Sequence, residues 1–248
     1  MKRIYVYAGA ILTLCLGVCG ILVVLHGKDI TREAPDKTAE EQRVDTTVPE
    51  SKQDENQGEN EGQQEELAEP LDDEYVKVSD YIPDVVVDLR YATTNNFTGT
   101  AIYDFQDAYL RYGTVKKLAV AQERLKALGF RIKIWDAYRP FSAQERLWQV
   151  CPNPRYVANP ANGMKAHNLG GTVDMTIVTL EGADVEMPSE FDDFSVRADR
   201  DYSDVSEVAG NHGRMLEQIM TECGFAGYDG EWWDYSDTTQ YAPVDFEP

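Results

Sequence analysis

The sequence predicts an α+β domain with a single mixed, largely antiparallel sheet and flanking helices, preceded by a membrane anchor and a disordered linker. Three observations lead to this prediction. An uncharged apolar run covers residues 4–25, and an acidic polar stretch follows at 29–74. Short strand patterns mixed with helical patterns then fill residues 75–248, and a mixture of this kind is typical of an α+β domain.

The first 28 residues read as a membrane anchor. Lys2 and Arg3 precede the apolar run, and about twenty apolar residues suffice to cross a bilayer. A cleaved signal peptide is the alternative, but the apolar core of a signal is normally shorter, so we favour an uncleaved anchor over residues 1–28. Positive residues before the run place the N-terminus in the cytoplasm and the rest of the chain outside.

Residues 29–74 form a different kind of segment. They contain four Lys and Arg against seventeen Asp and Glu, a net charge of −13. A stretch with so little to bury does not offset the entropy of ordering, so we expect a disordered, self-repelling tether. Most of the net charge of −21 lies here, and this acidic excess gives no support to nucleic-acid binding.

The folded domain is predicted at residues 75–248 as alternating strand and helix signals. Residues 85–89 and 131–135 read as strands, and a third strand begins at Thr172. A helix capped by Thr114 and ended by Gly129 lies between the first two. Its apolar face comprises Leu118, Ala121, Leu125 and Leu128.

Two further helices follow from capping and periodicity. Ser142 and Glu145 have the spacing of a capping box for a short helix through Trp148. An apolar stripe over residues 215–223 predicts a last helix that stops at Gly224.

The cysteines leave two alternatives. Cys15 and Cys19 lie in the apolar segment, and Cys151 and Cys223 lie in the domain. An oxidising exterior permits a disulfide between the latter two, but sequence does not show proximity, and we favour two separately buried thiols.

The segment 165–178 carries the clearest chemical signal. From Thr172 its residues alternate, so that the apolar side chains point to one face and Asp174 to the other. Gly170 and Gly171 permit a tight turn that brings His167 back towards Asp174. An imidazole and a carboxylate placed together are two ligands of a divalent metal, with zinc the usual candidate. A His–Asp hydrogen bond in a polar pocket is the alternative.

Two other residues are candidates for catalysis. Glu231 precedes two tryptophans, and a carboxylate beside a metal ion can serve as a general base. The alternative is an aromatic packing cluster with a surface acid. Arg139 lies after a strand and before a proline, where a fixed guanidinium could stabilise an oxyanion. Its alternative is an ordinary surface salt bridge.

Five motifs occur in an order that resembles the VanX-type D-alanyl-D-alanine dipeptidases, zinc peptidases related to D,D-carboxypeptidases with an α+β fold. The resemblance covers essentially all of residues 76–246. Its motifs lie at 91–99, 135–140, 167–174, 191–192 and 231–233.

The resemblance implies a role for each matching residue. His167 and Asp174 look like zinc ligands, Glu231 like the catalytic base, and Arg139 like the transition-state arginine. Asp192 resembles a carboxylate that pairs with the substrate's free amino group. The implied partner is a small D,D-dipeptide or cell-wall peptide. Together with the anchor at 1–28, this predicts a domain on the extracytoplasmic side of a bacterial cell membrane.

The chain departs from the family at two places. Asp234 stands where the family has a histidine that is the third zinc ligand, and Lys165-Ala166 stand where it usually has small hydroxyl residues. Aspartate can also ligate zinc, so we expect His167, Asp174 and Asp234 to form the metal set. Two carboxylates make the metal a weaker Lewis acid and make harder ions such as Mn²⁺ more competitive.

Two functions remain open at this point. The first is an active metallopeptidase that cleaves D-Ala-D-Ala or a related short peptide, or a D,D-carboxypeptidase that acts on longer stem peptides. The second is a zinc-poor homologue that binds a wall peptide or a partner protein. Glu231, Arg139 and Asp192 favour the first, and Asp234 favours the second.

Overall fold

The structure, a computed structural model, describes residues 68–248. Within this part of the chain no helix is both long enough and apolar enough to cross a bilayer. The predicted anchor at 1–28 and the linker as far as residue 67 lie outside the described residues. The end of the predicted linker contacts the domain, since Asp72 pairs with Lys116 and its carbonyl accepts a hydrogen bond from Gly113.

A five-stranded sheet organises the domain in the order β2-β4-β5-β7-β6. Only β2 and β4 run parallel, and the other neighbours are antiparallel, as predicted. The strands are β2 Val86–Val87, β4 Phe130–Asp136, β5 Thr172–Thr179, β6 Phe225–Tyr228 and β7 Glu231–Asp237.

The prediction of a single sheet is wrong. Strands β1 (Tyr75–Lys77) and β3 (Tyr109–Arg111) form a separate antiparallel pair. Each has only three residues, too few for an alternating pattern to identify in the sequence.

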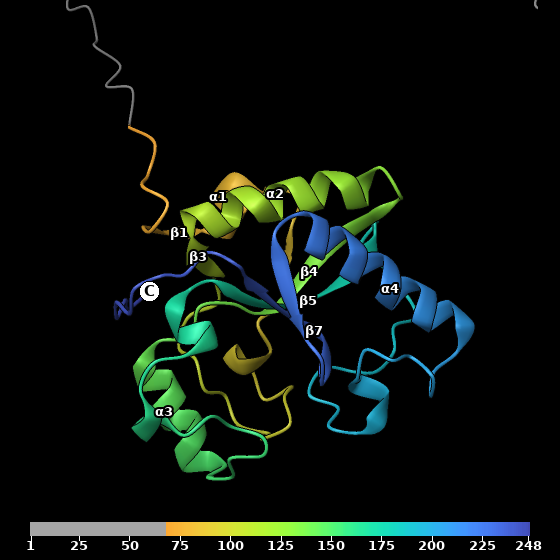
Figure 1. Cartoon of the computed structure of the whole chain (residues 1–248). Coiled ribbons are helices and arrows are strands. Elements are labelled where there is room, and N and C mark those ends of the chain that lie inside the picture. Colours follow the sequence, from red (N-terminus) through yellow and green to blue (C-terminus); the bar gives the residue numbers. More distant parts are fainter. Residues whose placement is uncertain (1–67) are drawn as a thin grey trace, which may run out of the picture. The chain divides into compact units, whose positions relative to one another are not determined.

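Helices α2 and α4 lie side by side against the five-stranded sheet, and α3 lies apart from them (Figure 1). Helices α2 and α4 pack against each other, with α2 on β4 and α4 on β6. The helices are α1 Val78–Tyr81, α2 Tyr112–Lys126, α3 Phe141–Val150 and α4 Glu207–Glu222. Short 3-10 helices occur at Arg90–Ala92, Pro160–Asn162, Ala166–Leu169 and Val196–Ala198.

The predicted helix starts are wrong by a few residues. Helix α2 begins at Tyr112, so Thr114 lies inside it, and its hydroxyl donates to Asp237 instead of capping the helix. Helix α3 begins at Phe141, so Ser142 does not form a capping box with Glu145, and its hydroxyl donates to Glu247. In each case a tertiary hydrogen bond takes the hydroxyl that the local pattern assigned to a cap.

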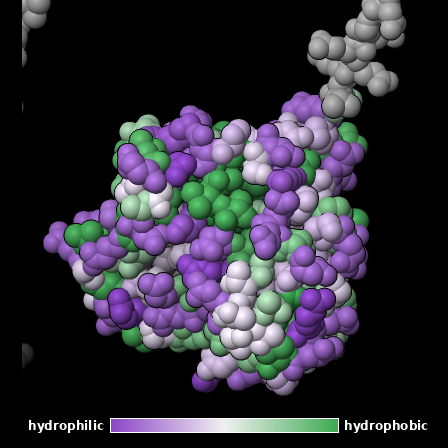
Figure 2. Space-filling view, turned by 180° about the vertical axis from the view of Figure 1, so that it is seen from behind, coloured by the Kyte–Doolittle hydropathy of each residue, from purple (hydrophilic) through white to green (hydrophobic). Residues whose placement is uncertain are grey.

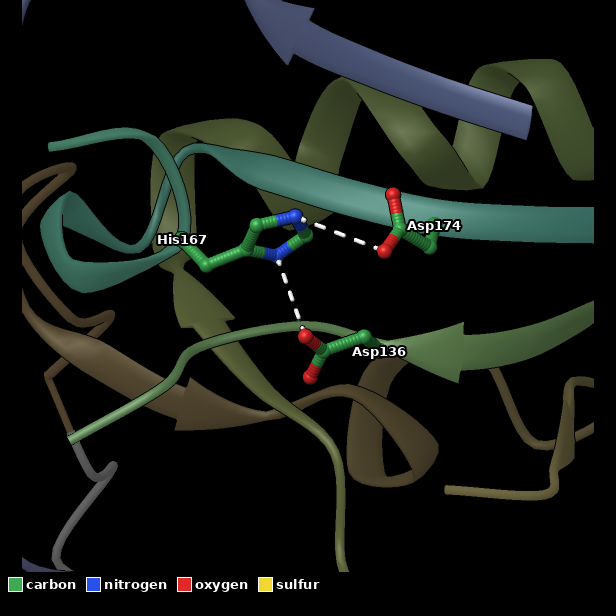
Figure 3. A group of neighbouring side chains, drawn as sticks. All are labelled: Asp136, His167 and Asp174. Atoms are coloured by element: carbon green, nitrogen blue, oxygen red, sulfur yellow. Dashed lines mark ion pairs between the residues drawn. The ribbon is translucent and has the colours of Figure 1, made fainter. Parts of the chain in front are cut away.

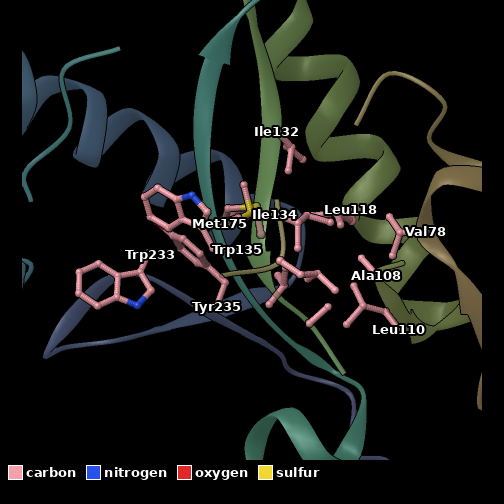
Figure 4. Close-up of a cluster of buried hydrophobic side chains, with 14 of the residues drawn as sticks. Val78, Ala108, Leu110, Leu118, Ile132, Ile134, Trp135, Met175, Trp233 and Tyr235 are labelled. Carbon is pink, nitrogen blue, oxygen red and sulfur yellow. The ribbon is translucent and has the colours of Figure 1, made fainter. Parts of the chain in front are cut away.

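The core lies between the sheet and α2, where Leu118 meets Ile134 and Met175 (Figure 4). Leu128 lies outside it and is 54% exposed, because α2 ends at Lys126. Strand β5 is buried from Thr172 to Val178, so its polar face is covered as well as its apolar face. Asp174 therefore lies in a protected environment.

The face opposite that of Figure 1 shows mainly polar residues around a limited apolar patch (Figure 2). Cys151 and Cys223 are both free and only partly buried, so they do not form a disulfide.

Candidate active site

All six residues singled out in the sequence line one cavity of about 350 Å³. They come from four separate parts of the chain, which the sheet and its loops bring together. The six are Arg139, His167, Asp174, Asp192, Glu231 and Asp234. His212, the other described histidine, is in α4, where its Nδ1 lies 2.8 Å from the carbonyl oxygen of Glu186. It does not line this cavity.

His167 is positioned by its own short helix and by the turn that follows. The helix Ala166–Leu169 ends at Gly170, whose φ of 75° is left-handed. A Cβ on Gly170 would lie 2.3 Å from the Tyr75 ring, so the turn requires glycine. The Nδ1 atom of His167 is 2.8 Å from the carbonyl oxygen of Ala137, and Nε2 is 3.5 Å from Oδ2 of Asp174 (Figure 3).

That arrangement assigns the two ring nitrogens different roles. Nδ1 donates to the carbonyl, which leaves Nε2 to face Asp174 as a proton carrier or as a metal ligand. Burial by itself would lower the pKa of His167, but the carboxylates of Asp174 and Asp136 outweigh it and raise this pKa to about 10. The imidazole ring therefore lies in a strongly negative field.

Asp174 and Asp234 face each other across β5 and β7. They are register partners in the antiparallel ladder, and directly opposed like charges destabilise a sheet. Burial, followed by the charge of Asp174, raises the pKa of Asp234 to about 7. The Oδ1 atom of Asp174 is buried without a hydrogen-bond partner among residues 68–248.

Asp136 was missed in the sequence analysis, although it lies in the motif 135–140. It is the register partner of Asp174 on the β4 side, and Asp136, His167 and Asp174 form a group with metal-ligand spacing. However, Oδ1 of Asp136 accepts hydrogen bonds from Tyr103 (2.5 Å) and Ala137 (2.9 Å). Its Oδ2 pairs with Arg139 and is 3.7 Å from the Nδ1 side of His167. Asp136 thus orients Arg139 and His167, whereas Asp174 keeps a free oxygen for a ligand.

Arg139 is buried rather than part of a surface salt bridge. Its guanidinium pairs with Asp136, and Nη1 donates to Gln144 at 2.9 Å. It also lies over the Tyr91 ring, 5.1 Å from the centroid. Burial opposes the charge, but Asp136 outweighs it, so the pKa of Arg139 is raised well above its ordinary range. The group is a fixed cation at the cavity wall.

Asp192 reaches the cavity from a loop in a backbone conformation that is uncommon for aspartate, with φ of 58°. Tyr91 donates to its two carboxylate oxygens at 3.1 and 3.3 Å. Burial, followed by the charge of Asp174, raises the pKa of Asp192 to about 7. Tyr91 is a second residue whose chemistry the sequence analysis missed, because its partner lies 101 residues away.

Glu231 begins β7 at the cavity, followed by Trp232 and Trp233 in the core. Trp232 donates to the Ser189 hydroxyl at 2.9 Å, so the aromatic pair both packs and anchors the strand. Burial, followed by Asp174 and Asp234, raises the pKa of Glu231 to about 8.

The donor set fits a divalent cation. His167 offers Nε2, and Asp174 offers an oxygen without another partner among residues 68–248. Asp136 completes the group with metal-ligand spacing, whereas Asp234 stands opposite Asp174 on the same face but is not part of that group. One nitrogen and carboxylate oxygens are ligands for zinc and for harder ions such as manganese. A cation would also relieve the repulsion that raises the pKa values of the neighbouring acids.

Comparison with known proteins agrees with the fold and the cavity. Residues 72–247 match the Peptidase_M15 family, described as D-ala-D-ala dipeptidase. The chain is 34% identical over 162 residues to the D-alanyl-D-alanine dipeptidase of Escherichia coli (strain K12), covering 65% of this chain and 83% of that protein. It is 30% identical over 187 residues to the protein of that name from Streptomyces coelicolor, covering 66% and 91%.

A third relative, the D-alanyl-D-alanine dipeptidase of Enterococcus faecalis, is 30% identical over 168 residues, covering 60% of this chain and 83% of that protein. The family match covers most of the chain and includes every residue of the cavity described above. This chain belongs to the Peptidase_M15 family of D-Ala-D-Ala dipeptidases, a family of metallopeptidases.

Proposed function

We propose that this chain hydrolyses D-Ala-D-Ala or a related short D-amino-acid peptide of the bacterial cell wall, with one divalent cation held by His167, Asp174 and Asp234. The observation that carries this proposal is the carboxylate of Asp174: its Oδ1 is buried without a hydrogen-bond partner among residues 68–248, and its Oδ2 lies 3.5 Å from Nε2 of His167. Asp234 is its register partner on β7. A bound cation would supply Lewis-acid polarisation of the scissile carbonyl and acidification of the attacking water.

The residues of the chain divide the remaining work. Glu231 accepts a proton from the attacking water and returns it to the leaving amine. Arg139, held by Asp136 and Gln144, presents a fixed positive charge where the oxyanion develops. Because this guanidinium is buried and already ordered, no reorganisation is needed during the reaction.

The substrate's amino end lies against Asp192. Its carboxylate is held by Tyr91 in a buried position and complements an ammonium group. The substrate's carboxylate end would lie toward Lys165 and Arg155, two cations at the same cavity. Neither has an ion pair within residues 68–248.

The apolar run at 4–25 bears on where in the cell this reaction takes place. We propose that residues 1–28 anchor the chain in a bacterial cell membrane and that the domain works on the extracytoplasmic side, where wall peptides are found. Digestion of the domain by protease added to intact spheroplasts would support this placement. Full protection that is lost on lysis would contradict it.

The decisive experiment combines metal analysis with hydrolysis by the purified full-length protein. We expect about one Zn²⁺ or Mn²⁺ per chain and turnover of D-Ala-D-Ala, but not of L-Ala-L-Ala. Faster turnover of stem peptides that end in D-Ala-D-Ala would indicate a D,D-carboxypeptidase. A protein without stoichiometric metal or turnover, yet binding wall peptide, would overturn the proposal in favour of a zinc-poor binding homologue.

A further inference from the structure

Strand β7 departs from its neighbour at the residues that serve the cavity. In the ladder with β6, Gly227 pairs with Tyr235 and Tyr228 pairs with Glu231, so one step along β6 matches four along β7. The residues between, 232–234, therefore bulge away from β6. Bulges re-aim side chains and are common beside active sites, but they leave ladder hydrogen bonds unmade.

Arg200 supplies hydrogen-bond donors at this bulge. Its Nε donates to the carbonyl of Tyr228 at 2.8 Å, and its Nη2 donates to the carbonyls of Glu231 (3.1 Å) and Asp234 (2.8 Å). Nη1 donates to the Tyr235 hydroxyl at 3.2 Å, and the guanidinium lies 4.5 Å from the centroid of that ring. The Arg200 side chain is only 7% exposed. One side chain thus joins the two residues proposed as base and ligand through their backbones.

Gly227 makes room for this arrangement. A Cβ at that position would lie 2.3 Å from Cζ of Arg200 and 2.6 Å from Nη2, a separation that atoms do not tolerate. The backbone of Gly227 does not have a positive φ, so the requirement for glycine comes from the guanidinium and not from the turn. Gly227 on β6 and Arg200 on the loop before α4 are therefore both needed for the contact between the guanidinium and the β7 bulge.

We propose that Arg200 is a positioning residue: its guanidinium holds the β7 bulge so that Glu231 and Asp234 are presented to the cavity together. This inference rests on the proposed function for the roles of Glu231 and Asp234, but the hold on the backbone is independent of metal. Arg200 lines neither end of the proposed substrate path and acts only through the strand.

Amide hydrogen exchange on the metal-free full-length protein tests the hold. We expect Arg200→Ala to increase exchange over residues 228–235 and to leave helix α2 unchanged. Arg214→Ala is the matched control, because Arg214 also lies over a tyrosine ring, that of Tyr202, but its guanidinium donates to Asn211 and makes no hydrogen bond or ion pair with β7. If Arg200→Ala does not fold, Gly227→Ala, which displaces the guanidinium while keeping the arginine, gives the same test.

Metal affinity tests the positioning. Loss of a group that orients metal ligands typically costs about 10–100-fold in metal affinity, and we expect such a loss in Arg200→Ala but not in Arg214→Ala. Because the substrate still meets Asp192 and Arg139, kcat should fall more than KM rises. Added guanidinium ion at millimolar concentration should restore part of the lost metal affinity in Arg200→Ala, whereas ammonium should not.

The outcomes are distinct. Unchanged exchange at 228–235, or faster exchange with metal affinity within about twofold of wild type, would overturn the inference. If the wild-type protein itself binds no stoichiometric metal, the proposed function fails. In that case the exchange result alone decides whether Arg200 holds the bulge.

Discussion

Replacing Asp234 by asparagine separates the energetic cost of the opposed carboxylates from their use as ligands. Asp174 and Asp234 are register partners on adjacent strands, and an amide keeps nearly the shape of the side chain while removing its charge. Without a cation, the wild-type pair repels or must hold a proton. The variant should therefore be more stable than wild type when metal-free, and less able to gain stability from metal.

The size of the effect follows from the pKa of Asp234, which is raised from 3.8 to about 7. A carboxyl group with a raised folded-state pKa contributes fully to stability below its unfolded-state pKa, and this contribution is lost as pH rises through about 7. At about 1.4 kcal/mol per pKa unit, the loss is on the order of 4 kcal/mol by pH 8. Asp234→Asn should thus raise the free energy of unfolding at pH 8 by this order, with little change near pH 4.

The assay is urea unfolding followed by tryptophan fluorescence at pH 5, 6, 7 and 8, with chelator and then with Zn²⁺ or Mn²⁺. Asp107→Asn, which breaks an exposed ion pair with Lys77, is the control and should change stability little at any pH, because exposed ion pairs contribute little. Metal at a hundredfold excess over its Kd should stabilise wild type by about 2.7 kcal/mol, and Asp234→Asn far less. Identical pH profiles for wild type and Asp234→Asn would refute the reasoning on the carboxylate pair, and equal metal stabilisation would refute ligation by Asp234.

Other predictions test the remaining roles. His167→Ala should abolish metal binding measured by elemental analysis, whereas His212→Ala, outside the cavity, should retain it. Metal retained in His167→Ala would contradict the assignment of His167 as a ligand. Glu231→Gln should keep the metal and lower kcat by about 10²–10⁴-fold, and a fully active variant would exclude Glu231 as the base. The N-acetyl dipeptide should have a lower kcat/KM than the free dipeptide, because it leaves Asp192 unpaired. The expected loss of transition-state stabilisation is about 1–3 kcal/mol. Equal rates on the two substrates would show that the substrate's amino group does not pair with Asp192.

The sequence predicted the residues of the cavity better than the elements that carry them. His167 and Asp174 were paired from local signals: an alternating strand, a double glycine and a spacing of seven. The structure brings them to 3.5 Å for the same reasons, since Gly170 turns the chain and β5 fixes Asp174. Arg139 likewise follows directly from the end of β4.

Features that depend on distant partners were not predicted. The hydroxyl of Thr114 has the chemistry of a cap, but Asp237, 123 residues away, takes it. Tyr91 gains its role from Asp192, and Arg200 gains its role from a bulge that becomes apparent only when β6 and β7 are paired. A local pattern records what a side chain can donate, whereas the fold decides which acceptor it meets.

The three aspartates of β4, β5 and β7 show how one row of identical side chains acquires different functions. Both carboxylate oxygens of Asp136 accept hydrogen bonds, from Tyr103, Ala137 and Arg139. Asp136 therefore serves a structural role and holds the Arg139 guanidinium in place. Asp174, next in the row, keeps an oxygen without a partner among residues 68–248. Burial, followed by the charge of Asp174, raises the pKa of Asp234 beyond it to about 7. A proton and a cation would therefore compete for the carboxylate of Asp234.

The same competition extends to the base. Glu231 has a pKa of about 8 because it is buried near Asp174 and Asp234, so at neutral pH it is mostly protonated in the metal-free protein. A divalent cation between those aspartates would remove the repulsion and favour the ionised carboxylate that accepts a proton. An aspartate at 234 strengthens this dependence, since it adds negative charge that only a cation or a proton offsets. Under the proposed function, Glu231 would thus become a base when the cation is bound.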